Sequence, residues 1–417
     1  MVLCATAGLP AATLDGSWEF TILRFGEPDY SRATFQTNGD KLTGKSGELT
    51  IEGTVNGETV NFTARDKEGK PSGEFKGTVL EGVLVGTAKF DDGAANWTAQ
   101  RPAERPAGAP KAHRFFTRTF HRQFSSSIPP VMHVFPGDSV TTSTVDAGGV
   151  DSGGTQRSAG GNPLTGPFYI ENAWPGDTLV VRFNRIRLSR DSATHSDGIV
   201  GHAFEPYYFK DLKRVEKFDS DWKLDRERGV ATLKNPTEKL KNLSLKVAPM
   251  LGCVGVAPPG NQAFQSGRLG SFGGNMDYNQ IREGVTLYLP VYHPGALLFV
   301  GDGHALQGDG ELTGDALETS MDVEFTVDVA PGQSLDMPRA ENSEYVMALG
   351  IGGSLRDALQ AATTNMAQWL ERDYKLNSAE VAMVLGTSIR YDIAEIVDGP
   401  LNLAAKVPKS VLSQLSK

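Results

Sequence analysis

The stretch GALLFVGDGHALQGDGELTGDALETSMDVEFTVDV, residues 295–329, contains the pattern that decides the fold. It begins with an unbroken apolar run, continues through an acidic, glycine-rich segment, and ends with apolar residues at alternate positions from Met321 to Val329. A short apolar run is consistent with a buried strand, and strict alternation is typical of a strand with one wet face. The stretch therefore predicts two strands joined by an acidic loop.

Strand patterns also dominate on both sides of this stretch, from His113 to about Val329, with Pro-Gly pairs that break them. Helical patterns appear only near the C-terminus. A stripe of apolar residues from Leu355 to Leu370 follows Ser354, which has the spacing of a helix cap. A second helix is predicted from Ser378 to Leu385, with Gly386 as its stop. We expect a mainly β domain with α+β elements at its C-terminal end.

The N-terminal part, residues 13–101, is predicted to form a separate small antiparallel β-barrel or meander. Its short strands are separated by hairpin signals such as Asn38-Gly39, Asn56-Gly57 and Asp92-Gly93. The GSW start and the strand spacing resemble a small lipocalin-like module. Trp18 and Trp97 are most simply core residues, and a ligand-lined barrel mouth is the alternative. Residues 102–111 are rich in proline and predict an extended linker to a second domain, 112–417.

Length and composition limit the classes of function. The 417 residues favour two or three folding units, and the excess of 50 acidic over 41 basic residues gives a net charge of −9. This charge disfavours nucleic acid as a partner. No apolar run is long enough to span a membrane. Residues 1–12 are small and apolar, like the remnant of a leader, which favours a secreted or periplasmic protein, with the cytoplasm as the alternative.

The acidic segment, residues 301–318, is the strongest candidate for chemistry. If the preceding apolar run continues as a strand, Asp302 and His304 project from the same face, at a spacing that two ligands of one metal ion can use. Carboxylate and imidazole together suit zinc, and oxygen-rich surroundings would suit calcium or manganese. The alternative is an ordinary acidic turn between two strands.

Other parts of the chain offer further ligands. Asn275 and Asp277 lie in a Gly-Gly-Asn-Met-Asp segment that can either bind a ligand or form a turn. Asp146 follows a predicted strand and could supply another carboxylate. His304 is the histidine that lies among several acids; each of the others is more simply a packed or surface residue. The common serine-hydrolase, zincin and P-loop motifs are not found in the sequence.

Several of these segments also carry a family resemblance. From about residue 113 to 409 the chain resembles the acetamidase/formamidase family in IPPVMHVFPGDSVTTSTVDAGG, FGGNMDYNQIREGVTLYLPV, GALLFVGDGHALQGDGE and VDGPLNLAAKVPK, which occur in the family's order. The resemblance implies a β-rich fold with added α+β elements and hydrolysis of short amides to carboxylate and ammonia. The chain departs from the family in its N-terminal module, its expected export and an insert at 189–209, which leaves its substrate open.

The resemblance places nine residues in the family's motifs, and we assign them roles as a hypothesis. The expected metal ligands are Asp302, His304, Asp146 and Glu318. Glu311 and Asp309 are the expected catalytic acids, and Asn275, Asp277 and Gln307 the expected substrate-binding residues. A divalent ion, zinc first and calcium or manganese otherwise, would activate water for attack on a small amide, and Glu311 would move the proton.

Two other functions stay open from the sequence. One is an exported, non-catalytic protein that binds a small ligand or a glycan, with the acidic cluster around a structural calcium ion. The other is a hydrolase of the same fold that acts on an ester or a larger amide. An exposed apolar strand edge would allow a homodimer, which the sequence does not decide.

Overall fold

The computed structural model describes residues 14–212 and 218–416, so the expected leader remnant, 1–12, lies outside the described residues. The chain divides into two compact units between Pro106 and Ala107, within the proline-rich segment. Each unit is described by itself. Among the described residues, none of the helices combines the length and the apolar character needed to cross a lipid bilayer.

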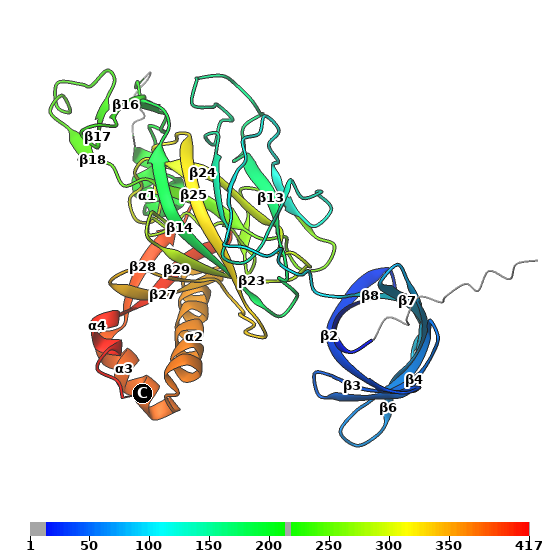
Figure 1. Ribbon diagram of the computed structural model, residues 1–417. Coiled ribbons are helices and arrows are strands. Elements are labelled where there is room, and N and C mark those ends of the chain that lie inside the picture. Colours follow the sequence, from blue (N-terminus) through cyan, green and yellow to red (C-terminus); the bar gives the residue numbers. More distant parts are fainter. Residues whose placement is uncertain (1–13, 213–217, 417) are drawn as a thin grey trace, which may run out of the picture. The chain divides into compact units, whose positions relative to one another are not determined.

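The smaller unit is a closed antiparallel barrel of eight strands, each paired with the next and the last with the first (Figure 1, blue). Apolar residues alternate along its strands and meet inside, where aromatic rings such as Phe35, Phe62 and Trp97 form the core. The predicted barrel is confirmed. Its strands are β1 (Gly16–Arg24), β2 (Glu27–Asn38), β3 (Lys41–Ser46), β4 (Leu49–Asn56), β5 (Thr59–Arg65), β6 (Pro71–Leu80), β7 (Val83–Phe90) and β8 (Gly93–Gln100).

The larger unit contains a sheet of nine strands in the order β28-β29-β27-β26-β23-β14-β25-β12-β9. The alternating segment that follows the acidic loop forms β25, which pairs with β14 along its length. In order along the chain, the strands are β9 (Ala112–Arg114), β12 (Ser139–Ser143), β14 (Thr178–Leu188), β23 (Thr286–Pro290), β25 (Met321–Ala330), β26 (Arg339–Glu341), β27 (Tyr345–Gly352), β28 (Arg390–Glu395) and β29 (Leu401–Pro408).

A second sheet of six strands, β11-β13-β24-β19-β22-β21, holds the residues that follow the apolar run. Its central strands β24 and β19 are buried along their whole length and contribute to the large apolar core of the unit. The strands are β11 (Met132–Val134), β13 (Leu164–Ile170), β19 (Met250–Gly255), β21 (Leu269–Gly270), β22 (Gly273–Asn275) and β24 (Leu298–His304).

Smaller elements complete the unit. The segment that contains the predicted insert forms a four-stranded sheet, β15 (Ser192–Ala193), β16 (Trp222–Asp225), β17 (Val230–Leu233) and β18 (Ser244–Lys246), with a short 3-10 helix (Gly201–Ala203) and α1 (Pro206–Asp211). Strands β10 (Gln123–Ser125) and β20 (Ala263–Gln265) form a pair.

The helices near the C-terminus, α2 (Leu355–Tyr374), α3 (Ser378–Ser388) and α4 (Lys409–Leu412), belong to the same unit. Figure 1 shows α2 beside β27 and β29, and its buried residues form a core with both strands. Gly350 allows the close approach, since a Cβ there would lie 2.1 Å from the Ala358 carbonyl oxygen.

Ser354 caps α2 as expected. The prediction that Gly386 ends the next helix is wrong, because α3 continues to Ser388 with a capping box at Asn377. The mainly β fold class is confirmed.

Candidate functional site

The site begins at the end of β24, where the apolar run is followed by two polar residues on one face. Asp302 and His304 are two positions apart and are 2% and 1% exposed. Asp302 Oδ1 lies 3.5 Å from His304 Nε2. Asp302 has a φ of 57°, in the left-handed region, which is uncommon for a residue other than glycine and recurs at functional sites.

The acidic loop turns back on β24 and brings two more carboxylates to it. Glu318 pairs across from His304, and the backbone N–H of Thr319 donates to the Gly303 carbonyl. This pairing places Glu318 Oε1 3.1 Å from His304 Nε2. Earlier in the loop, Gly310 pairs with the end of β28, and the next residue, Glu311, is 6% exposed. The loop therefore folds its acids inward.

The neighbouring strands complete the enclosure. Asp277 follows β22 and is fully buried, with its Oδ1 3.9 Å from His304 Nε2. Gly252, on β19, forms one wall of the cluster: an added Cβ would lie 2.2 Å from Asp277 Oδ1 and 2.6 Å from Asp302 Oδ2. A side chain at this position would therefore occupy the space into which the carboxylates point.

Gln307 decides which nitrogen of His304 faces the carboxylates. The Gln307 side-chain amide donates to the carbonyl oxygens of Asp277, at 2.5 Å, and Ala394, at 3.2 Å. Carbonyls only accept, so the other end of the side chain is the oxygen, which accepts from His304 Nδ1 at 2.9 Å. Nδ1 thus carries a proton, and Nε2 is the atom that faces the acids. This is the arrangement that holds a metal-ligating histidine in its tautomer.

Three carboxylate oxygens at the cluster accept no hydrogen bond from the described residues: Asp277 Oδ1, Asp302 Oδ1 and Glu318 Oε2. Ligand atoms of Asp302, His304 and Glu318 lie within 4.8 Å of one another, and so do those of Asp277, His304 and Glu311. Ionised carboxylates with buried, unused lone pairs around an imidazole nitrogen are stabilised by a positive charge between them. The donor set and the space beside Gly252 fit a divalent cation.

The electrostatics of the described groups agree with this. Burial raises the pKa of Asp277 and of Glu311 well above their ordinary values, and neighbouring carboxylates raise both further. Burial raises the pKa of Glu318 to about 6. Burial lowers the pKa of His304, but the Glu318 and Asp302 carboxylates outweigh it, and the pKa ends well above 6.5. Ionising all of these acids together is therefore costly in the fold as described, and a bound cation would offset that cost.

Two predicted site residues lie elsewhere. Asp146, expected as a metal ligand, joins neither group of ligand atoms: its side chain accepts from Arg190 at 2.6 Å and from the Val150 N–H. Asp309, expected to be catalytic, is exposed and accepts from Asn279. Neither acid is brought into the cluster, because each turns toward a donor in its own surroundings.

Two of the expected substrate-binding residues hold neighbouring side chains instead. Asn275 donates to Asp277 and Asp398, and its oxygen accepts from Asn162 and the Cys253 thiol. Every hydrogen-bonding position of this amide is used. The Gln307 side chain is likewise held by hydrogen bonds, to His304 and to the carbonyl oxygens of Asp277 and Ala394. Both act on the site through other residues, and Asp277 lies among the potential ligands.

The sequence reasoning missed several residues at this site. Gly252 and Asn162 are among them; Asn162 donates to Asp302 Oδ2 at 3.0 Å. Glu395 was also missed: it is fully buried, and burial raises its pKa to about 8. One signal was available, since Asp398 and Glu395 flank the start of VDGPLNLAAKVPK, one of the segments that carry the family resemblance.

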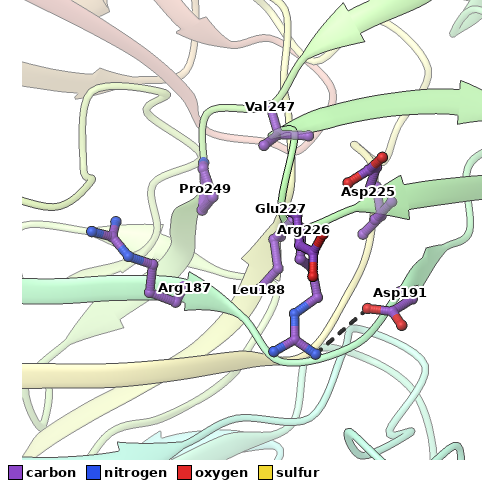
Figure 2. A pocket seen from close by; sticks show the side chains of 9 residues that line it. Arg187, Leu188, Asp191, Asp225, Arg226, Glu227, Val247 and Pro249 are labelled. Carbon is purple, nitrogen blue, oxygen red and sulfur yellow. Dashed lines mark hydrogen bonds and ion pairs between the residues drawn. The ribbon is translucent and has the colours of Figure 1, made fainter.

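A separate cavity of about 890 Å³ lies in the same unit (Figure 2). It is lined by β14, by the four-stranded sheet and by Pro249, and Figure 2 shows Arg226 turned toward Asp191, 3.5 Å away. None of the cluster residues lines it. Arg226 pairs with Asp191 within the lining, whereas Arg187 and Asp225 pair with Glu283 and Arg228 outside it. We assign this cavity no chemistry.

Comparisons with known proteins agree with the motif resemblance. A model of the acetamidase/formamidase family matches residues 262–414. A predicted acetamidase/formamidase of Thermoanaerobacter tengcongensis is similar in structure, with a TM-score of 0.63 and 26% identity over 74% of this chain and 99% of that one. An acetamidase from Yersinia enterocolitica gives a TM-score of 0.62 and 26% identity, over 73% and 94%.

A curated formamidase from Methylophilus methylotrophus is 24% identical over 249 residues, which are 46% of this chain and 59% of that protein. The chain thus spans about half the length of the curated relatives it matches. The predicted resemblance to this family is confirmed, and it includes the acidic loop and the Gly-Gly-Asn-Met-Asp segment.

Proposed function

We propose, because the larger unit of this chain is related to the acetamidase/formamidase family, that the protein hydrolyses the C–N bond of a small linear amide and needs a divalent cation to do so. The observation that carries the proposal is the group of buried, unpartnered carboxylate oxygens around His304 Nε2. Perturbed acids that the fold does not neutralise are typical of functional sites.

The residues that would hold the cation are His304, Asp302 and Glu318, whose ligand atoms lie closest to Nε2. One imidazole with carboxylates suits zinc first, and additional oxygens from Asp277 would suit manganese or calcium. When bound, a divalent cation supplies a Lewis acid and lowers the pKa of water. It would also offset the mutual repulsion of the buried acids.

Glu311 is the residue that we propose moves the proton. It lies beside the expected ligands without being one of the three, and its carboxylate can take a proton from water as the oxygen attacks the amide carbon. The same proton then goes to the nitrogen, the C–N bond breaks, and ammonia leaves from a carboxylic acid, which loses its remaining proton to solvent to give the carboxylate. Gln307 and Asn275 keep His304 and Asp277 in position.

The test is release of ammonia from formamide and acetamide by the purified full chain. Treatment with a chelator should abolish the activity, and addition of Zn²⁺, Mn²⁺ or Ca²⁺ should show which ion restores it. His304→Ala should lose bound metal and activity together. Full activity in protein shown by elemental analysis to be free of metal would contradict the cation requirement while leaving amide hydrolysis intact.

A larger amide or an ester is the second candidate substrate, and one observation favours it. The insert contacts the acidic loop directly: Thr194 pairs with Glu318, Ser196 donates to Asp315, and the Val200 N–H donates to the Leu312 carbonyl. A segment held against the catalytic loop can shape what enters it. A panel of short amides, longer amides and matching esters distinguishes the substrates, and preference for formamide or acetamide would exclude this second candidate.

A further inference from the structure

The barrel contains a cavity of about 250 Å³ that the proposed hydrolysis does not involve. It occupies one end of the barrel. Along β1 the inward side chains are Trp18, Phe20, Ile22 and Arg24, and the last three line the cavity. The opposite end is closed, because Trp18 donates to the Leu14 carbonyl at 2.8 Å and the Arg101 guanidinium lies 4.5 Å from its ring.

The walls of this cavity are aromatic. Phe62 and Phe75 stack with ring centroids 4.6 Å apart and planes 7° apart, and Phe20 meets both edge-on. Phe20 also stacks at 5.3 Å on Trp97, whose indole N–H has no partner among the described residues. Between the rings the strands carry small residues, including Ala33, Ala64 and Ser31. These small residues leave the interior of an eight-stranded barrel unfilled at this end, where such barrels can hold one small ligand.

The charges at the rim indicate which molecules fit. Arg24 forms an ion pair with Asp92, and its guanidinium lies 4.4 Å from the Phe90 ring centroid. Asp29 adds a second carboxylate to the same rim. The Arg24 guanidinium is therefore already neutralised by Asp92, and Asp29 remains as a further carboxylate beside the cavity. An anionic ligand is disfavoured, whereas flat rings can stack on the aromatic walls.

From this cavity we infer that the barrel is a binding site for a small, uncharged aromatic molecule of about one or two fused rings. A molecule of this size suits the cavity, because the volume of the cavity is just below the usual range for ligand pockets. Stacking on Phe62 and Phe20 gives the affinity, and the serine hydroxyls of the wall offer polar contacts. The inference does not depend on the activity of the larger unit.

The test is a fluorescence titration of the full chain with 6-propionyl-2-(dimethylamino)naphthalene, an uncharged probe of two fused aromatic rings whose emission changes in apolar surroundings. We expect saturable binding of one probe per chain. Ala64→Leu fills the cavity from β5 and should weaken binding by at least about tenfold. Thr63→Leu places the same side chain on the outer face of the same strand and should leave binding unchanged. Ala33→Leu, from β2, provides a second filled cavity.

Circular dichroism of each variant shows whether the barrel is folded, so that loss of binding is read only from folded protein. Displacement of the probe by 1-naphthol but not by 1-naphthoate supports a preference for an uncharged ligand. Equal displacement of the probe by both compounds overturns this preference. The absence of saturable binding overturns the site itself. Binding that survives in both Ala64→Leu and Ala33→Leu places the probe elsewhere and overturns it equally.

Discussion

In the barrel, the buried carboxylate of Glu19 lies 3.2 Å from the guanidinium of Arg32, whereas in the larger unit Asp302 and Glu318 share one imidazole. Glu19 therefore has its counter-charge within the fold. Asp302 and Glu318 each keep a carboxylate oxygen without a partner among the described residues. A buried acid that the fold neutralises needs no further explanation, but a group that it leaves unneutralised destabilises the folded state and points to a bound cation.

The largest effect is expected at Glu311. Glu311→Gln removes the proposed proton carrier and should lower kcat for amide hydrolysis by about 10²- to 10⁴-fold. Bound metal should be retained, because Glu311 is not one of the three proposed ligands. Ammonia release and elemental analysis measure the two quantities. Glu19→Gln is the matched control in the barrel and should leave kcat unchanged; an unchanged kcat in Glu311→Gln would remove Glu311 from the mechanism.

Substitutions of paired and unpaired acids should change stability in opposite directions. Asp146→Asn breaks a buried pair, with side chains 4% and 11% exposed, and should lower the free energy of unfolding by about 3–5 kcal/mol. Asp302→Asn, measured with a chelator present, removes one of the two carboxylates that share the single His304 imidazole and should raise the free energy of unfolding by about 1–3 kcal/mol. Urea unfolding tests both. Destabilisation by Asp302→Asn in metal-free protein would show that the fold itself needs this charge.

Gly252, which forms one wall of the cluster, should give the next largest effect, on metal affinity. Gly252→Ala would place a methyl group 2.2 Å from Asp277 Oδ1, and it should weaken metal binding by about 10- to 100-fold without changing any charge. Gly267→Ala is the control, since a Cβ there meets nothing within 4 Å. Competition with a metal indicator measures the affinity. Equal affinities in the two variants would exclude a cation from this space.

The strands of the site could be predicted because they depend on local pattern. The apolar run before Asp302 predicts β24, and strand spacing predicts Asp302 and His304 on one face. The left-handed φ of Asp302 is a local departure from strand geometry that the pattern does not show. The loop that returns Glu318 to His304 could be suspected from its glycines, but its path is set by pairing with β28, which lies about 80 residues further along the chain.

The two expected site residues that lie outside the cluster were placed there for a different reason. Asp146 and Asp309 have the residue type of a ligand, and the sequence does not show which donor lies nearest to each carboxylate. Gly252 carries no side chain to attract notice, and its importance appears only when the strands are assembled. Contacts between distant segments, which no local pattern encodes, therefore account both for the expected residues that lie outside the cluster and for the residues that were missed.

A pH effect sharpens the comparison further. Burial raises the pKa of Glu395 to about 8 in the folded protein, from an ordinary 4.5. The folded state therefore keeps a proton that the unfolded chain loses, and this contribution to stability is complete below pH 4.5 and is lost as the pH rises to about 8. Metal-free protein should be more stable to urea at pH 5 than at pH 8. In Glu395→Gln, the difference in stability between the two pH values should be smaller. The same pH difference in both proteins would contradict the assignment.

The central claim, that the acids around His304 are kept unpaired for a cation, is tested most directly by elemental analysis of the purified full chain beside His304→Ala and Glu19→Gln. The account predicts one divalent ion per chain in the unaltered protein and in Glu19→Gln, and none in His304→Ala. The same metal content in all three proteins, or none in any of them after supply of zinc, manganese and calcium, would contradict it.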